Sequence, residues 1–225
     1  MLDAEELLGA EAARRARAGE PVRLGFLGGT FDPPHEGHRR LAAAAKGALG
    51  LDRLLIVPTG RPAFKQDRQV APGNLRLEMC RALAASLGGT AVCDAEVRRP
   101  GVTYAADTLR ELREALPDAV EIVYVVGADA ALTLPRWHEA TQLANLAAFA
   151  VANRPGYELD ADALASLEQA GFKVEPFAMP AADVSSSEVR RRIGAGAAAE
   201  GLVPAEVLRI IEREGLYRKE NGHDR

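Results

Sequence analysis

The chain has 225 residues, of which 48% are hydrophobic, and its 28 Lys and Arg against 32 Asp and Glu give a formal net charge of −4. A single domain of this size buries roughly 70–75% of the surface that its unfolded chain exposes, so it needs no disulfide or metal to stay folded. The weakly acidic balance excludes a nucleic-acid coating protein and gives no attraction to an anionic membrane, so any polyanion must be bound by local positive charge.

The compartment follows from what the sequence lacks. No stretch reaches the roughly 18 apolar residues of a membrane span, and the N-terminus opens with Asp3, Glu5 and Glu6 rather than a basic segment. Cys80 and Cys93 lie among apolar neighbours, in neither a CxxC nor a zinc-binding spacing. We therefore expect reduced, buried thiols in a cytoplasmic protein.

The predicted elements alternate between helices and strands. Residues 2–19 are rich in helix formers, acidic first and basic later, and Gly19 and Pro21 end the pattern, which predicts one helix appended outside the core. Short apolar runs then alternate with helical segments, which is typical of a parallel sheet with both faces covered. The expected strands are 22–29, 54–58, 91–94, 121–126, 147–152 and 172–177, and the expected helices after the first are 38–49, 74–87, 103–116, 160–170 and 204–214.

This pattern predicts an α/β doubly wound parallel sheet with a small C-terminal helical part. We expect one domain over residues 22–225, preceded by the helical extension 1–21. Ligands of such sheets bind beyond the carboxyl ends of the strands where the strand order reverses. The loops after the first, second, fourth and fifth strands are therefore the places to expect a site.

The loop after the first strand reads GGTFDPPHEGH and carries two histidines three residues apart. His35 and His38 fall on one face at the start of a helix, where the first-turn amides are unpaired donors, so imidazoles and amides together suit a phosphate. Gly28 and Gly29 let a phosphate chain approach the backbone, and Asp32 suits the turn. The alternatives are a helix cap with incidental histidines, or a metal site, for which a third ligand is lacking nearby.

This loop resembles the GGTFDPxHxGH signature of the HxGH nucleotidyltransferase superfamily, in the form found in bacterial nicotinate-nucleotide adenylyltransferases. It is neither a P-loop nor a GxGxxG fingerprint. The resemblance implies a Rossmann-like nucleotidyltransferase fold in which His35 and His38 contact the ATP phosphates, and His38 stabilises charge at the α-phosphorus. It also implies that Thr30 and Phe31 contact ATP, with Thr30 reaching the acceptor as well.

The segment SSSEVRRRI at 185–193 resembles the second signature of this family, ISSTxIR. The resemblance assigns Ser185, Ser186 and Arg190 to the ATP phosphates. Hydroxyls at a helix start and an arginine one turn later also suit a triphosphate on chemical grounds. Alone, the segment is a common capped helix, and Arg191 and Arg192 are equally consistent with a solvated face.

Two weaker segments add basic residues. PTGRPAFKQDR resembles the loop that carries a Lys or His to the phosphates and acceptor, which implies Lys65, with Arg61 as the second candidate; a lysine in a Pro/Gly loop is often merely solvated. ANRPGYEL resembles RRPGY, with Asn153 in place of the first arginine. The matching Arg154 either holds the adenine-side ribose or phosphate, or braces the turn.

The stretch VYVVGADAALTLPRWHEATQL resembles the part of the family that binds the nucleotide sugar and the pyridine ring. The resemblance places Gly127 and Asp129 at the nucleotide, and Trp137 and His138 at the acceptor. A carboxylate just after a strand suits ribose hydroxyls, and a tryptophan face suits an electron-poor ring. Trp137 is the sole tryptophan, and an ordinary core position is its alternative.

RRPGVTYAADTLREL resembles the SYTAxTL segment, whose backbone amides read the nicotinate carboxylate. The matching residues are Tyr104 and Ala105, with Thr108 behind them. Ala105 stands where threonine is frequent, which leaves a contact through the amide intact.

The resemblance implies an enzyme that transfers the adenylyl group of ATP to nicotinate mononucleotide, forming deamido-NAD and pyrophosphate. Mg²⁺ is expected to arrive with ATP, without a dedicated protein metal site. The expected partners are these small molecules, with no nucleic acid or membrane; the oligomeric state, a homo-oligomer included, stays open. The alternatives are nicotinamide mononucleotide or phosphopantetheine as acceptor, or a nucleotide-binding regulator without turnover.

Overall fold

The computed structural model describes residues 2–62, 70–156, 158–181 and 183–218. Within these residues, six parallel strands form one sheet in the order β4-β2-β1-β6-β7-β8. The strands are β1 (Val22–Gly29), β2 (Arg53–Pro58), β4 (Thr90–Val92), β6 (Val120–Gly127), β7 (Ala148–Asn153) and β8 (Val174–Ala178). The predicted strands are confirmed to within two residues at either end. A separate parallel pair joins β3 (Arg61–Pro62) to β5 (Val102–Thr103).

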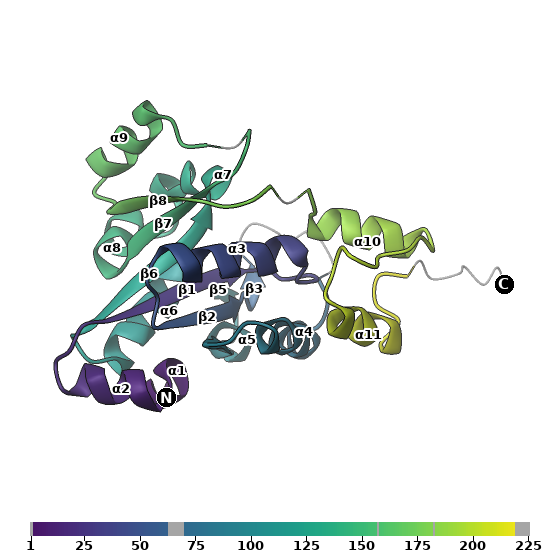
Figure 1. Ribbon diagram of the computed structural model, residues 1–225, viewed down its shortest axis with the longest axis horizontal. Coiled ribbons are helices and arrows are strands. Elements are labelled where there is room, and N and C mark those ends of the chain that lie inside the picture. Colours follow the sequence, from purple (N-terminus) through teal and green to yellow (C-terminus); the bar gives the residue numbers. More distant parts are fainter. Residues whose placement is uncertain (1, 63–69, 157, 182, 219–225) are drawn as a thin grey trace.

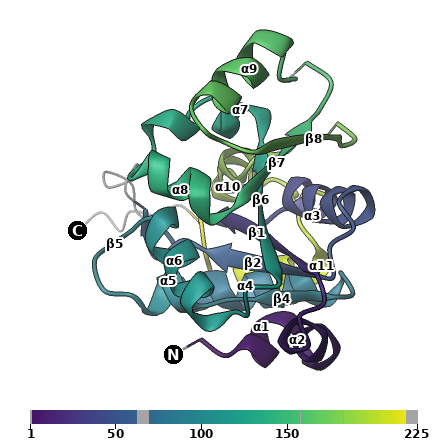
Figure 2. The ribbon, with the colours of Figure 1, turned by 90° about the vertical axis from the view of Figure 1, so that its left-hand side faces the viewer.

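Helices cover both faces of the sheet, as the doubly wound prediction requires (Figures 1 and 2). Successive residues of a strand point to opposite faces, so Ile122 and Tyr124 of β6 belong to one buried cluster, and Val123 and Val125 to the other. The first face carries α1 (Ala4–Leu8), α2 (Ala10–Arg17), α5 (Ala95–Arg98), α6 (Ala105–Ala115), α7 (Ala128–Ala131), α8 (Ala140–Leu146) and α9 (Ala161–Gln169). The second carries α3 (Glu36–Ala48), α4 (Gly73–Ala85), α10 (Ser186–Gly194) and α11 (Ala205–Arg213).

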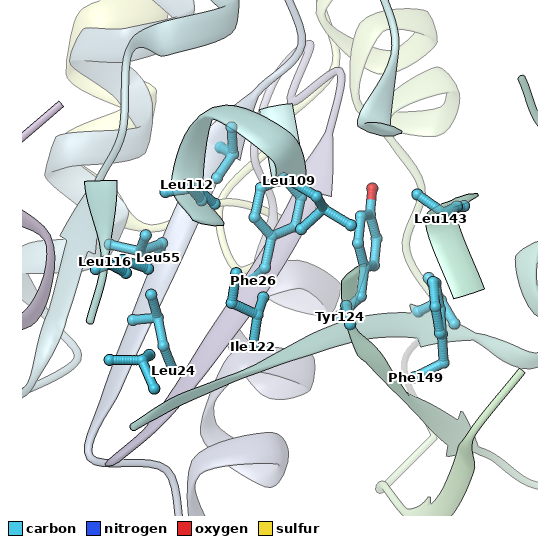
Figure 3. Packing of buried hydrophobic residues seen from close by; sticks show 14 of the residues in the cluster. Leu24, Phe26, Leu55, Leu109, Leu112, Leu116, Ile122, Tyr124, Leu143 and Phe149 are labelled. Carbon is cyan, nitrogen blue, oxygen red and sulfur yellow. The ribbon is translucent and has the colours of Figure 1, made fainter. Parts of the chain in front are cut away.

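Aromatic rings and leucines fill the core of the first face (Figure 3). The ring centroid of Tyr124 lies 4.5 Å from that of Phe26 and 5.6 Å from that of Phe149. Leu109 and Leu112 of α6 are fully buried in the same cluster. Each such side chain contributes about 1.5–3 kcal/mol by leaving water, so α6 is held firmly on the sheet.

The N-terminal segment differs from the prediction in two ways. Gly9, with φ of 79°, separates α1 from α2, so two helices stand where one was expected. The expected placement outside the core is wrong, because Leu7, Leu8 and Ala13 are buried in the first-face cluster. Figure 1 shows α1 and α2 near the start of β1, at the end of the sheet away from α10 and α11. The division of the chain at residue 21 stays a prediction.

The strand order reverses at β1. The chain leaves β1 toward α3 on the second face, and leaves β6 toward α7 and α8 on the first face. A crevice therefore opens beyond the carboxyl ends of β1 and β6. It is flanked by elements too short to give a sequence period, among them α5, α7 and the 3₁₀ turn Leu134–Arg136.

The two thiols behave as expected. Cys80 and Cys93 are both free and buried, and burial raises the pKa of both. They therefore stay protonated near neutral pH. None of the helices in the described ranges is long and apolar enough to span a bilayer.

Gly60, after β2, tests how tightly the strand ends pack on their neighbours. A Cβ added there would lie 2.0 Å from the backbone oxygen of Glu96. We expect Gly60→Ala to lower the free energy of unfolding by about 1–3 kcal/mol, measured by urea denaturation. Gly47→Ala is the matched control, because a Cβ on this residue of α3 meets nothing within 4 Å and should stabilise by about 0.5–1 kcal/mol. Equal effects of the two substitutions would contradict the packing.

Candidate active site

A cavity of about 490 Å³ lies at the predicted edge, where β1 and β6 end. Its lining comes from the ends of these strands, the starts of α3 and α6, and the loop after α7. It brings together these predicted site residues: Gly28, Gly29, Thr30, His38, Tyr104, Ala105, Gly127, Trp137 and His138. The cavity thus joins segments that were assigned separately to ATP and to the acceptor.

Gly28 has a structural role that sequence reasoning missed. A Cβ there would lie 2.5 Å from the hydroxyl oxygen of Tyr124 and 2.9 Å from the ring of Phe26. Gly28 therefore lets the first-face core reach the cavity wall, in addition to leaving its backbone accessible.

The two motif histidines cap the start of α3 together. His35 is the N-cap; its Nδ1 accepts from the Gly37 amide at 3.1 Å, while its own amide donates to Nδ1 of His38 at 3.2 Å. The two rings lie against each other, tilted by 36°, with their centroids 3.8 Å apart. Because both Nδ1 atoms accept, the proton of each neutral ring lies on Nε2. The half-buried His38 lines the cavity, whereas His35 is buried behind it.

This arrangement corrects the expectation that first-turn amides are open to an anion. The Gly37 amide is taken by His35, and the Glu36 amide donates to the carbonyl of Leu202 at 2.9 Å. Burial lowers the pKa of His35 to about 4, so this imidazole is neutral at pH 7. His35 therefore contributes no positive charge to the site at this pH.

The second signature segment packs against the histidine loop. Ser186 Oγ donates to the carbonyl of Pro33 at 2.9 Å, and Arg190 Nη1 donates to the carbonyl of Asp32 at 2.5 Å. The hydroxyl of Ser185 caps α10 by accepting from the Glu188 amide at 3.2 Å. The first two contacts join segments that are more than 150 residues apart in the chain.

Arg191 and Arg192 lie on the solvated face of α10, the alternative that the sequence left open for them. Arg191 and Arg192 both pair with Glu188, and each of the three side chains is at least 31% exposed. Hydrogen bonds from these two guanidinium groups lower the pKa of Glu188 to about 2. The pair thus forms the solvated face of α10.

The opposite wall of the cavity is aromatic. Trp137 is half-buried; its Nε1 donates to Thr133 Oγ1 at 2.9 Å, and its ring makes an edge contact with Tyr124 at 5.8 Å. The ring of His138 stacks on that of Tyr104 with centroids 4.1 Å apart. Trp137 is therefore anchored on one side by the core and lines the cavity on the other.

The start of α6 meets this wall. Tyr104 is the N-cap, and among the described side chains none caps the helix start by a hydrogen bond. Thr108, fully buried behind it, donates to Glu96 Oε1 at 3.0 Å and accepts from Arg99 at 2.9 Å. The first-turn amides of α6 thus suit an anionic group, with the positive end of the helix dipole behind them.

Sequence reasoning missed two buried polar residues of the cavity wall, Glu96 and Thr103. Burial raises the pKa of Glu96. The only available signal was an acid within the short run DAEVRRPG, which lacks a helical or strand period. Their place in the wall follows from α5 and β5, both too short to predict.

Other predicted residues lie outside the cavity lining. Phe31 is buried behind the histidine loop, with its ring 4.7 Å from that of His38. Asp129 is exposed on α7, and the half-buried Arg154 follows β7. Arg61 is exposed in β3. Lys65 lies outside the described residues.

Comparisons with known proteins agree with this geometry. The family model described as cytidylyltransferase-like matches residues 26–192. A Dehalococcoides mccartyi protein named "probable nicotinate-nucleotide adenylyltransferase" is 40% identical over 202 residues, covering 87% of this chain and 97% of the relative. A Thermomicrobium roseum protein of the same name is 39% identical over 197 residues, covering 87% and 92%.

A solved structure of Plasmodium falciparum nicotinic acid mononucleotide adenylyltransferase, complexed with NaAD, shares the fold. Its TM-score is 0.73 at 18% identity, and the match covers 87% of this chain and 97% of that one. The fold and site define a nucleotidyltransferase of the α/β type. The chain belongs to the cytidylyltransferase-like family and, within it, to the nicotinate-nucleotide adenylyltransferases.

The buried neutral His35 predicts a dependence of stability on pH. Its pKa of about 4 lies below the ordinary 6.5, so its contribution is complete above about pH 6.5 and is lost as the pH falls toward 4. At 1.36 kcal/mol per pKa unit, the loss is on the order of 3 kcal/mol. Urea denaturation at pH 7.5 and pH 4.5 measures it.

The matched variant is His35→Asn, whose side chain still caps the helix but does not titrate. We expect its free energy of unfolding to fall less than that of the native protein over the same interval. Parallel losses in the two proteins would contradict a buried neutral His35.

Proposed function

We propose that this protein transfers the adenylyl group of ATP to nicotinate mononucleotide, forming deamido-NAD and pyrophosphate. The observation that carries the proposal is that one cavity has the histidine loop at one wall and, at the other, an aromatic ring beside a helix start that none of the described side chains caps. The names of relatives with about 40% identity support the same reaction. A regulator that only binds nucleotide would not need the second wall.

In this reaction a phosphate oxygen of the acceptor attacks the α-phosphorus of ATP. A new P–O bond forms as the bond from the α-phosphorus to the bridging oxygen breaks, and that oxygen leaves with pyrophosphate. The protein supplies position and charge rather than a nucleophile. His38 donates from Nε2 toward the phosphates, while neutral His35 holds the helix start that carries it.

ATP lies, in this proposal, along the ends of β1 and β6. Backbone groups of Gly28, Gly29, Thr30 and Phe31 follow the phosphates, and Ser185, Ser186 and Arg190 approach from α10. Gly127 and Asp129 meet the ribose, and Arg154 meets the adenine side. The position of Arg190 supports its proposed contact with the phosphates, because its guanidinium donates to a backbone carbonyl of the histidine loop.

The acceptor lies at the aromatic wall. The pyridine ring stacks on Trp137, next to His138, and the nicotinate carboxylate accepts from the amides at Tyr104 and Ala105. A carboxylate gains more from a helix start than a neutral carboxamide does, because the dipole attracts negative charge. This difference favours nicotinate over nicotinamide mononucleotide. Thr30 and Lys65 are proposed to contact the acceptor's phosphate.

Mg²⁺ is proposed to enter with ATP, because this cation is commonly held by substrate phosphates with only one or two carboxylates. Among the described residues, no three His, Cys, Asp or Glu side chains gather as a ready-made metal site. We further propose the cytoplasm as the compartment, since ATP is abundant there and both thiols are buried and free.

Pyrophosphate release with Mg-ATP tests the proposed reaction directly. We expect release with nicotinate mononucleotide, at a kcat/KM at least about tenfold above that for nicotinamide mononucleotide, and none with phosphopantetheine. Release with phosphopantetheine alone would overturn the acceptor. ATP binding without release under any of the three acceptors would favour a regulator.

His38→Ala tests the phosphate wall. Losing one preorganised donor at developing charge should lower kcat by about 10²–10³-fold. Losing the contact of Nδ1 with the His35 amide should lower the free energy of unfolding by about 0.5–2 kcal/mol and leave the protein folded. Arg192→Ala is the control, because this exposed side chain pairs with Glu188 on the solvated face, and it should keep native turnover. Near-native kcat in His38→Ala would remove His38 from the mechanism.

Trp137→Ala tests the aromatic wall. Base stacking on an aromatic ring is worth about 1–3 kcal/mol, so the KM for nicotinate mononucleotide should rise at least about fivefold. The KM for ATP should change by less than about twofold, and Trp137→Phe should restore part of the loss. Steady-state kinetics with each substrate varied in turn measure both constants. An equal rise in both KM values would argue for a core role instead.

A further inference from the structure

A buried polar cluster lies behind the histidine loop, outside the cavity lining. At its centre is Asp32, whose side chain is 1% exposed. Its Oδ1 accepts from the hydroxyl of Tyr217 at 2.8 Å and from the amide of Ala71 at 3.1 Å. Its Oδ2 lies 3.8 Å from Nη1 of Arg190. One carboxylate thus joins the histidine loop, the start of α4, α10 and the segment after α11.

Arg76 of α4 holds the backbone around Asp32 from the side of that helix. Its guanidinium is buried and donates to four backbone carbonyls: Thr30 at 2.9 Å, Thr59 at 2.6 Å, Gly60 at 3.0 Å and Ala71 at 2.9 Å. These carbonyls follow β1, follow β2 and precede α4. The backbone around Asp32 is therefore held on the α4 side before any ligand binds.

Tyr217 also holds Asp32, through the hydrogen bond from its hydroxyl. The residue follows α11, 185 positions away from Asp32, and its ring packs against the second-face core. Its backbone has φ of 64°, a left-handed conformation that residues with a side chain rarely adopt. Such a conformation persists when the surrounding contacts over-determine it. Burial and the neighbouring Asp32 raise the pKa of Tyr217, so its hydroxyl remains a donor.

The contact reaches the reacting region through Arg190. The Nη1 of Arg190 bonds the backbone oxygen of Asp32 and lies 3.8 Å from its carboxylate, so Arg190 and Tyr217 are both held by the same residue. We propose that Tyr217 is a positioning residue that, through Asp32, sets Arg190 and the histidine loop for the phosphates of ATP. The inference rests on the proposed function for its kinetic test only, since ATP binding can be measured without turnover.

The test substitution is Tyr217→Phe, which keeps the ring and removes the hydroxyl. A hydrogen bond to a charged group is worth enough that its loss should weaken Mg-ATP binding, measured by calorimetry, by about tenfold. The KM for ATP should rise or kcat fall by a similar factor, while the KM for nicotinate mononucleotide stays within about twofold. A double-mutant cycle with Asp32→Asn should show strong coupling between the two changes.

Leu216→Ala is the matched control. Leu216 is half-buried, precedes Tyr217 and packs against the same core, but among the described contacts it makes no hydrogen bond to Asp32. It should lower stability while leaving ATP binding near native. Native ATP binding by Tyr217→Phe, or a loss matched by Leu216→Ala, would overturn the proposal. If the unsubstituted protein binds ATP but transfers no adenylyl group, the proposed function is contradicted. The calorimetric comparison of the variants then still decides this inference.

Discussion

β1 lies between β2 and β6, and the chain leaves β1 and β6 on opposite faces of the sheet. Helices that cover opposite faces cannot close over the strand ends between them, so a crevice must remain there. The rest of the site depends on this constraint. It lets α3 bring His38 to the crevice from one face, while α6 and the loop after α7 bring Tyr104 and Trp137 from the other.

The charge distribution explains how a chain of net charge −4 can hold a triphosphate. His35 is buried and neutral, and its ring lies against that of His38. Arg190 comes from a distant part of the chain, and its guanidinium donates to a backbone carbonyl of the histidine loop. A weakly acidic whole-chain charge is thus compatible with a phosphate site.

Much of the fold could be predicted because buried parallel strands are nearly continuous apolar runs, and long helices show a clear period. The break at Gly9 could not, since both halves of the N-terminal segment are good helix formers. The spacing of His35 and His38 correctly predicted a shared helix start. It could not reveal that one ring would be buried, nor that Asp32 would meet Tyr217, because such pairings depend on tertiary packing across 185 residues.

A crystal structure with deamido-NAD would test most directly whether one cavity seats both substrates, since this product contains both nucleotide halves. The account predicts the pyridine ring against Trp137, its carboxylate at the amides of Tyr104 and Ala105, and the adenylyl phosphate beside His38. A product with either half bound outside the cavity between β1 and β6, or with its pyridine ring away from Trp137, would contradict it.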